Sequence, residues 1–145
     1  MNTNLSFTSS ARSTGGRKGV AEGQGVEPPI QFSAPPEFQG EAGMWTPEHF
    51  FTSAVASCYI STFQAIAGYS KFDAQAIEVS VIGELEKSSG GYQFSRVTLR
   101  PVLTISDESA RERGMQLLQK TEKACLVSRS LRSEIVLEPK VIVKT

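Results

Sequence analysis

The pattern of apolar and polar positions divides this chain of 145 residues into three zones. In the first zone, residues 1 to about 44, short apolar pieces are separated by glycines and by the pairs Pro28-Pro29 and Pro35-Pro36. Because proline has no main-chain N–H, any strands here are expected to be short or to lie at a sheet edge. The zone predicts a β-hairpin or β-meander, with residues 1–12 flexible.

The second zone, residues 46–68, carries the signals of one long helix. Thr46 is a suitable N-cap, Pro47 suits the first helical position, Glu48 favours the positive end of the helix dipole, and Gly68 is able to end the helix. Apolar side chains occupy more than one face, with alanines and serines between them. This composition is typical of a central helix against which other elements pack closely.

The third zone begins with two runs that alternate with period two, residues 76–86 and 92–105. The pair Gly90-Gly91 between them favours a turn, so these runs predict a long β-hairpin. Pro101 is expected to weaken the local strand pairing or to mark a bulge.

A second helix and a final strand are predicted after the hairpin. Residues 107–124 have apolar positions at helical spacing, with Ser106 as N-cap, and residues 134–143 read as a strand interrupted by Pro139. The order strands, helix, hairpin, helix, strand predicts an α+β fold. The length favours a single domain covering residues 1–145.

Charge and composition exclude several classes of function. Fifteen basic and fifteen acidic side chains cancel, so the chain lacks the basic footprint of a nucleic-acid-binding protein and no nucleic-acid partner is expected. No basic amphipathic helix, signal peptide or run of transmembrane length is expected either. The chain is therefore predicted to be cytoplasmic, with no membrane partner.

The two cysteines are the main candidates for chemistry. Cys58 lies in the middle of the first predicted helix and Cys125 at the end of the second, so only tertiary folding could bring them together. In a reducing compartment such cysteines are most often inert buried residues. A zinc site is disfavoured because the chain has one histidine and no closely spaced cysteine pair. No metal and no cofactor are expected.

Other thiol chemistries differ in what they require. A thioredoxin-like site needs a C-x-x-C motif, which is absent. A cysteine hydrolase would need His49 as the base for Cys58, but nine residues along one helix correspond to about 13 Å, so a partner chain would have to supply the histidine. A thiol also needs an activating group, and a guanidinium is a suitable one. The candidate arginines are Arg12, Arg17, Arg96, Arg100, Arg129 and Arg132.

Three stretches resemble motifs of one known family. W-T-P-E-H-F-F-T-S-A-V-A-S-C-Y resembles a signature in which Pro-Glu opens the central helix and a cysteine follows, and A-C-L-V-S-R-S-L resembles the second cysteine motif of that family. S-T-G-G-R-K-G resembles its Gly-Gly-Arg turn. By these motifs the chain is identified as a member of the OsmC/Ohr family of osmotically inducible and organic hydroperoxide resistance proteins. The family usually has proline after the second cysteine, where this chain has Leu126.

The resemblance implies an OsmC-like α+β fold and a peroxiredoxin-like thiol peroxidase that reduces organic hydroperoxides, and also hydrogen peroxide, in oxidative stress. It implies that Cys58 is the peroxidatic thiol, which becomes a sulfenic acid, and that Cys125 is the resolving thiol, which forms a disulfide with it. It further implies that Arg17 stabilises the thiolate and that Glu48 holds this arginine. An external dithiol, lipoyl-linked in some members, would reduce the disulfide.

Helix geometry and the resemblance together favour a homodimer. Glu48 and Cys58 are ten residues apart, about 15 Å along one helix, so one arginine could not easily bind both within a subunit. Either the start of the helix is irregular, or Glu48 and Arg17 approach the cysteine of a partner chain. The family resembles an intertwined homodimer with sites at the interface, so we predict an obligate homodimer. A non-catalytic binder of small apolar ligands and a redox sensor on the same fold remain alternatives.

Overall fold

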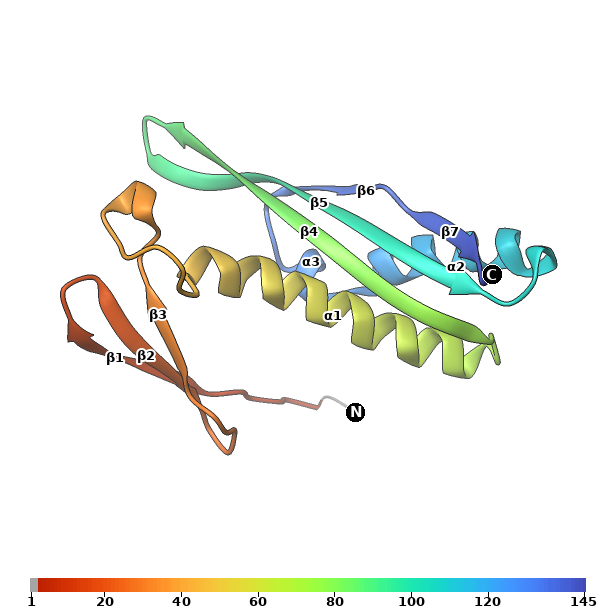
Figure 1. Cartoon of the computed structure of the whole chain (residues 1–145), viewed down its shortest axis with the longest axis horizontal. Helices are drawn as coiled ribbons and strands as arrows, with labels where there is room; N and C mark the ends of the chain where they lie inside the picture. Colours follow the sequence, from red (N-terminus) through yellow and green to blue (C-terminus); the bar gives the residue numbers. More distant parts are fainter. Residues whose placement is uncertain (1–2) are drawn as a thin grey trace. The chain divides into compact units, whose positions relative to one another are not determined.

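A computed structural model describes residues 3–145, which form two compact units (Figure 1). The N-terminal unit extends to Phe51, and the C-terminal unit runs from Thr52 to Thr145. Residues 9–12 of the segment expected to be flexible belong to a strand, and residues 1–2 lie outside the described residues. The flexibility of residues 1–12 and the single domain over residues 1–145 stay predictions.

The N-terminal unit contains the predicted β-meander, an antiparallel sheet in the order β1-β2-β3. The chain turns between β1 and β2 at Gly15 and Gly16, whose φ angles of 122° and 59° cost glycine little because it has no Cβ. A short 3₁₀ helix, η1, then leads toward the long helix. The bounds are β1 (Ser9–Gly15), β2 (Lys18–Gly23), β3 (Ile30–Ser33) and η1 (Pro36–Phe38).

Helix α1 (Pro47–Tyr69) begins where the sequence predicts. Thr46 Oγ1 accepts a hydrogen bond from the His49 N–H at 3.1 Å, which is the expected N-cap. The predicted end was wrong by one residue: the helix continues through Gly68 to Tyr69, and it is Lys71 that adopts a left-handed φ of 53°. The Lys71 N–H donates to the carbonyl of Gly68, which satisfies an acceptor of the last turn.

By length and composition alone, α1 could cross a membrane, with a mean hydropathy of 1.3 over its most apolar window. The expectation that no run reaches this length was therefore wrong for α1. The core helix of a globular domain meets the same criterion, so the finding is weak evidence for a membrane span. Its buried side chains form a single stripe at a spacing of four residues, namely Val55, Tyr59, Phe63 and Ala67.

The C-terminal unit is built on the predicted hairpin, in which β4 (Ala74–Ser88) pairs antiparallel with β5 (Gly91–Ile105). Strands β6 (Glu134–Leu137) and β7 (Lys140–Val143) both pair parallel with β5, one after the other. Pro101 marks no bulge and stays in register with β4. It lies where β5 changes its parallel partner from β6 to β7, so its missing N–H falls at a break in the ladder.

Two helices follow the hairpin instead of one. The predicted helix over residues 107–124 is a 3₁₀ turn, η2 (Glu108–Ala110), followed by α2 (Arg111–Ala124). Ser106 is not its N-cap: Asp107 precedes η2, and its carbonyl accepts a hydrogen bond at 3.0 Å from the Ala110 N–H three residues later, so the first turn closes more tightly than an α-helix. A further helix of four residues, α3 (Leu126–Arg129), was not predicted.

The core of the C-terminal unit lies between its helices and the hairpin (Figure 1). The Tyr59 hydroxyl donates to the Leu118 carbonyl at 2.9 Å, which joins α1 to α2. A Cβ on Gly83 of β4 would lie 3.1 Å from Thr52 of α1, so a glycine permits this close approach. Side chains at most 1% exposed include Val55, Tyr59, Phe63, Val97, Leu99, Leu103, Ile105, Leu118 and Cys125.

Candidate functional site

The two cysteines of the C-terminal unit lie in hydrogen-bond contact with one another. Cys58 is half-buried on α1, whereas Cys125 is completely buried between α2 and α3, and both are free thiols. Packing of the helices thus brings together two thiols that are far apart in the sequence. Their assigned roles as attacking and resolving thiols stay predictions.

The surroundings of Cys58 favour its thiolate. Burial raises the pKa of this thiol, but hydrogen bonds from the Cys125 thiol, from the N–H groups of Val127 and Leu126, and from Thr62 outweigh it. Thr62 lies one turn further along α1, with its Oγ1 3.8 Å from Cys58 Sγ. The net pKa of Cys58 is therefore below its ordinary value, although none of these influences comes from an arginine.

The surroundings of Cys125 have the opposite effect. Burial and the hydrogen bond to Cys58 raise the pKa of Cys125, as does the negative charge on Cys58, while the N–H and hydroxyl of Ser128 act in the other direction. The net pKa of Cys125 is above its ordinary value. Of the two thiols, Cys58 is therefore the one that loses its proton first.

Local backbone geometry explains how α3 contributes to this pair. At Cys125 the chain leaves the helical region, with φ −65° and ψ 113°, and then enters α3. The Arg129 N–H donates to the Cys125 carbonyl at 3.0 Å, closing the first turn. The N–H groups at the start of a helix have no acceptor within the helix, so those of Leu126 and Val127 are available to the sulfur of Cys58.

Sequence reasoning missed Thr62, Leu126 and Val127 as neighbours of the thiol. Thr62 could have been found from its spacing, because residues four apart share a helix face. The two N–H donors had no signal of their own in the sequence. The position of these two donors can be inferred only once the fold places Cys125 beside Cys58.

A buried phenol lies next to this pair. Tyr59 follows Cys58 on α1, and burial together with the charges of Glu122 and Cys125 raises the pKa of its hydroxyl. The hydroxyl is therefore a permanent hydrogen-bond donor, and it is used to hold α2 through Leu118. Tyr59 supports the position of Cys58 without supplying a proton at neutral pH.

The other two predicted site residues belong to the N-terminal unit. Arg17 lies in the β1–β2 turn and is exposed, and its guanidinium donates to Gln39 Oε1 at 2.9 Å. Glu48 lies in the first turn of α1, where one of its carboxylate oxygens is shielded from solvent. His49 is exposed, with Nδ1 2.9 Å from Thr46 Oγ1. The action of Arg17 and Glu48 on Cys58 stays a prediction.

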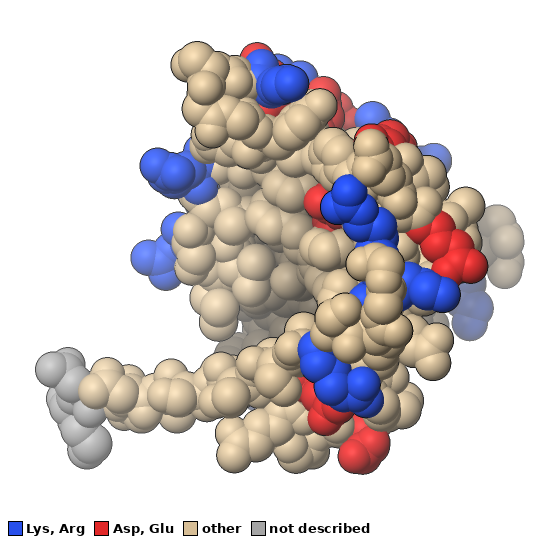
Figure 2. All heavy atoms as spheres, turned by 90° about the vertical axis from the view of Figure 1, so that its left-hand side faces the viewer, with Lys and Arg blue, Asp and Glu red and all other residues tan. Residues whose placement is uncertain are grey.

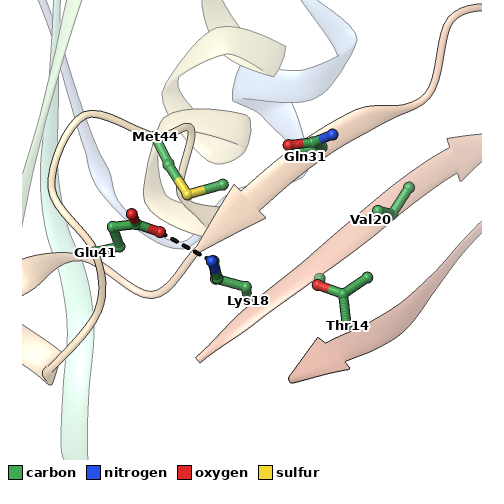
Figure 3. A pocket seen from close by; sticks show the side chains of 7 residues that line it. Thr14, Lys18, Val20, Gln31, Glu41 and Met44 are labelled. Atoms are coloured by element: carbon green, nitrogen blue, oxygen red, sulfur yellow. Dashed lines mark ion pairs between the residues drawn. The ribbon is translucent and has the colours of Figure 1, made fainter. Parts of the chain in front are cut away.

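The N-terminal unit also has an open cavity of about 530 Å³ (Figure 3). Lys18 and Glu41 form an ion pair at 3.2 Å across its wall, which ties β2 to the segment preceding α1. Both side chains are about half exposed, so the pair contributes at most about 1 kcal/mol to stability. None of the four predicted site residues lines this cavity. Its walls are formed by Thr14, Lys18, Gly19, Val20, Gln31, Glu41 and Met44.

The surface charge shows no single-sign patch on the face drawn in Figure 2, where basic and acidic side chains are interspersed. Among residues 3–145, no group of three or more His, Cys, Asp or Glu side chains is arranged to hold a metal ion. The thiol pair is the cluster of reactive side chains that the opposite pKa shifts single out.

Comparison with known proteins identifies the family. The model of OsmC-like proteins matches residues 40–140. An organic hydroperoxide resistance protein of Xanthomonas axonopodis pv. citri (strain 306) is 30% identical over 135 residues, 89% of each chain. An uncharacterized protein of Bacillus subtilis (strain 168), YmaD, is 23% identical over 115 residues, 77% of each chain.

Solved structures show the same fold. An OsmC-like protein of unknown function from Vibrio cholerae superposes with a TM-score of 0.81 at 20% identity, over 94% of this chain and 99% of that one. An organic hydroperoxide resistance protein OsmC from Legionella pneumophila gives a TM-score of 0.78 at 21% identity, over 97% and 99%. The α+β, OsmC-like fold predicted from the sequence is therefore confirmed. Together with the match of the family model, these likenesses show that the chain belongs to the OsmC/Ohr family.

Proposed function

We propose that this protein is a thiol-dependent peroxidase that reduces organic hydroperoxides, and also hydrogen peroxide, in the cytoplasm. The observation that carries the proposal is the hydrogen-bond contact between Cys58, whose pKa is lowered, and Cys125, whose pKa is raised. A half-buried thiolate is the nucleophile that the first step requires, and a protonated thiol beside it is the group that the second step requires. The relatives named for organic hydroperoxide resistance support this substrate class.

The proposed reaction has three steps. The Cys58 thiolate attacks one peroxide oxygen, the O–O bond breaks, and the leaving alkoxide takes a proton to become the alcohol; Cys58 is then a sulfenic acid. The Cys125 sulfur attacks that sulfenic acid, forming a disulfide and releasing water. An external dithiol, lipoyl-linked in our proposal, reduces the disulfide and is itself oxidised. Atoms and electrons balance without a metal or cofactor.

Arg17 and Glu48 complete the proposed site. A guanidinium is permanently charged and has forked donors, so Arg17 could both favour the thiolate and hold a peroxide oxygen, with Glu48 orienting it. The helix start at Thr46 is regular, which removes one of the two explanations for the separation of Glu48 and Cys58. We therefore propose that a partner chain in a homodimer supplies Arg17 and Glu48 to Cys58.

A second feature supports the homodimer. Only 28% of the most apolar window of α1 is buried within this chain. Apolar surface left in water costs about 25 cal/mol per Å², so a cover for this helix would be favourable. We propose that a second copy of this chain packs on the exposed apolar surface of α1 and also supplies Arg17 and Glu48 to Cys58.

The test is peroxide consumption by the purified protein with dithiothreitol, for the wild type, Cys58→Ser and Cys125→Ser. We expect turnover with cumene hydroperoxide that disappears in Cys58→Ser. In Cys125→Ser we expect a sulfenic acid that dimedone traps on Cys58. Slower turnover with hydrogen peroxide than with cumene hydroperoxide would agree with the proposed preference for organic hydroperoxides.

Two outcomes would favour the alternatives. Folded protein with free thiols that consumes neither peroxide would contradict the proposal and leave a non-catalytic ligand-binding protein. A single oxidation to the disulfide, with no turnover in excess dithiol, would point to a redox sensor.

A further inference from the structure

A buried hydroxyl beside the thiol pair has no hydrogen-bond partner. Ser128 of α3 is 3% exposed, and its Oγ is shielded from solvent without a hydrogen bond to any of residues 3–145. A buried polar group whose hydrogen bond is not made costs free energy, so each such group in a native structure calls for an explanation. The stability of the fold does not account for this hydroxyl.

Two neighbouring side chains show what a hydroxyl in this region ordinarily does. Ser130 Oγ donates to the Leu126 carbonyl at 2.8 Å, four residues back along the chain. The buried Thr121 of α2 donates in the same way to the Leu117 carbonyl at 2.7 Å. Bonds of this kind are the local option open to serine and threonine in a helix. Within the described part of the chain, the Ser128 hydroxyl makes no such bond, so it is available to another acceptor.

The sulfur of Cys125 is the acceptor that the geometry offers. Cys125 begins the turn that contains Ser128, and the Arg129 N–H closes this turn by donating to the Cys125 carbonyl at 3.0 Å. Side chains three residues apart on a helical turn lie on one side of it, and both of these are buried. The hydroxyl is close enough to the Cys125 sulfur to act against the rise in its pKa, although it makes no hydrogen bond to the protonated thiol.

We infer that Ser128 is a positioning residue for Cys125, and that its hydroxyl donates to the Cys125 sulfur when this sulfur becomes a thiolate. The inference rests on the proposed role of Cys125 as the resolving thiol. In that step an electron pair of the thiolate forms the S–S bond to the Cys58 sulfenic acid, and the S–O bond breaks. The departing hydroxide takes the proton that Cys125 released and becomes water. Ser128 keeps its own proton and orients the attacking sulfur.

The other groups near Cys125 do not supply this donor. Two titratable side chains of α1 interact with it, Cys58 and Tyr59. In the resolving step Cys58 is the sulfur under attack, and the Tyr59 hydroxyl already donates to the Leu118 carbonyl. Because Cys125 is 0% exposed, bulk water does not stabilise its thiolate either. A hydroxyl held beside the sulfur therefore has a large effect on its ionisation.

The experiment compares Ser128→Ala with Ser130→Ala, both in the Cys58→Ser protein, so that Cys125 is the single thiol. Ionisation of Cys125 is followed against pH from its ¹³Cβ resonance. We expect the transition of Ser128→Ala to move to higher pH, with about a tenfold smaller thiolate fraction on the acid side, because a hydrogen bond to a charged group is lost. Ser130→Ala should leave the transition in place. Superimposable transitions of Ser128→Ala and its parent would overturn the inference.

Folding stability separates this role from a purely structural one. In the reduced protein at neutral pH, Ser128→Ala replaces a hydroxyl that makes no hydrogen bond by a methyl group. Its urea midpoint should therefore be no lower than that of the wild type. A clearly destabilised or unfolded Ser128→Ala would show that the hydroxyl serves the fold and would overturn the inference. Neither measurement uses peroxide, so failure of the peroxidase assay is distinguishable from failure of this test.

Discussion

Replacement of Cys125 should change the ionisation of Cys58. The Cys125 thiol is the strongest of the donors that lower the pKa of Cys58, and Cys125→Ala removes it. A hydrogen bond to a charged group contributes about 1.5–3 kcal/mol, and a thiol is a weak donor, so we take a loss of about 1.4 kcal/mol. The pKa of Cys58 should therefore rise, and the thiolate fraction on the acid side should fall about tenfold.

The change in reaction rate should be smaller than the change in thiolate fraction. A thiolate of higher pKa is a better nucleophile, with a Brønsted coefficient of about 0.4–0.5, so alkylation near neutral pH should slow only about three- to fourfold. The assay is iodoacetamide alkylation of Cys125→Ala against pH. Cys125→Ser is the control because its hydroxyl still donates and Cys58 is again the single thiol. Equal profiles, or a lower pKa in the alanine variant, would refute the reasoning.

The same shift links pH to folding stability. The pKa of Cys58 in the folded protein is below its value in the unfolded chain, so ionisation stabilises the fold. This contribution is fully present above the unfolded pKa and is lost as the pH falls through the folded pKa. In Cys125→Ser, the free energy of unfolding should therefore rise with pH through this window, relative to the variant that lacks both cysteines. A constant difference between the two proteins would contradict the linkage.

Three further substitutions test the fold by urea unfolding followed by circular dichroism. Gly68→Ala should stabilise by about 0.5–1 kcal/mol, because Gly68 is helical with open space around it. An unchanged free energy of unfolding would argue against a helical conformation at Gly68. Gly40→Ala should destabilise by at least about 3 kcal/mol, since its Cβ would lie 1.5 Å from the Ala34 carbonyl oxygen. Unchanged stability would contradict this close approach between Gly40 and Ala34. Tyr59→Phe should cost about 1–2 kcal/mol by removing the buried hydrogen bond to Leu118, and no cost would argue against that bond.

Elements with local signals were predictable from the sequence. Thr46 and Pro47 mark the start of α1, and Gly90 and Gly91 mark the turn of the hairpin, because a cap and a turn depend on neighbouring residues alone. The start of the second helix was misplaced because both Ser106 and Asp107 are residues that favour caps, and sequence does not distinguish a 3₁₀ turn from an α turn. Local chemistry sets these elements to within a few residues.

The site depends on tertiary contacts, so it was only partly predictable. Residue type and the family resemblance singled out Cys58 and Cys125, but neither predicted α3 or the two N–H groups that it directs at the sulfur. A run of four residues is too short for helical periodicity to be recognised. Its conformation depends on tertiary contacts with residues far away in the sequence, and a local pattern of four residues does not contain that information.

The opposite pKa shifts of the two thiols also give the proposed reaction an order. In the reduced pair, the hydrogen bond to Cys58 and the charge that Cys58 carries when ionised raise the pKa of Cys125, so the proposed reaction with peroxide takes place at the partly exposed Cys58 rather than at the buried Cys125. Once Cys58 is a neutral sulfenic acid, its charge no longer raises the pKa of Cys125. Cys125 then ionises more readily, and does so at the moment when its attack on Cys58 is required. In the proposed mechanism, the contact that disfavours ionisation of Cys125 in the reduced state would thus cease to do so after oxidation of Cys58.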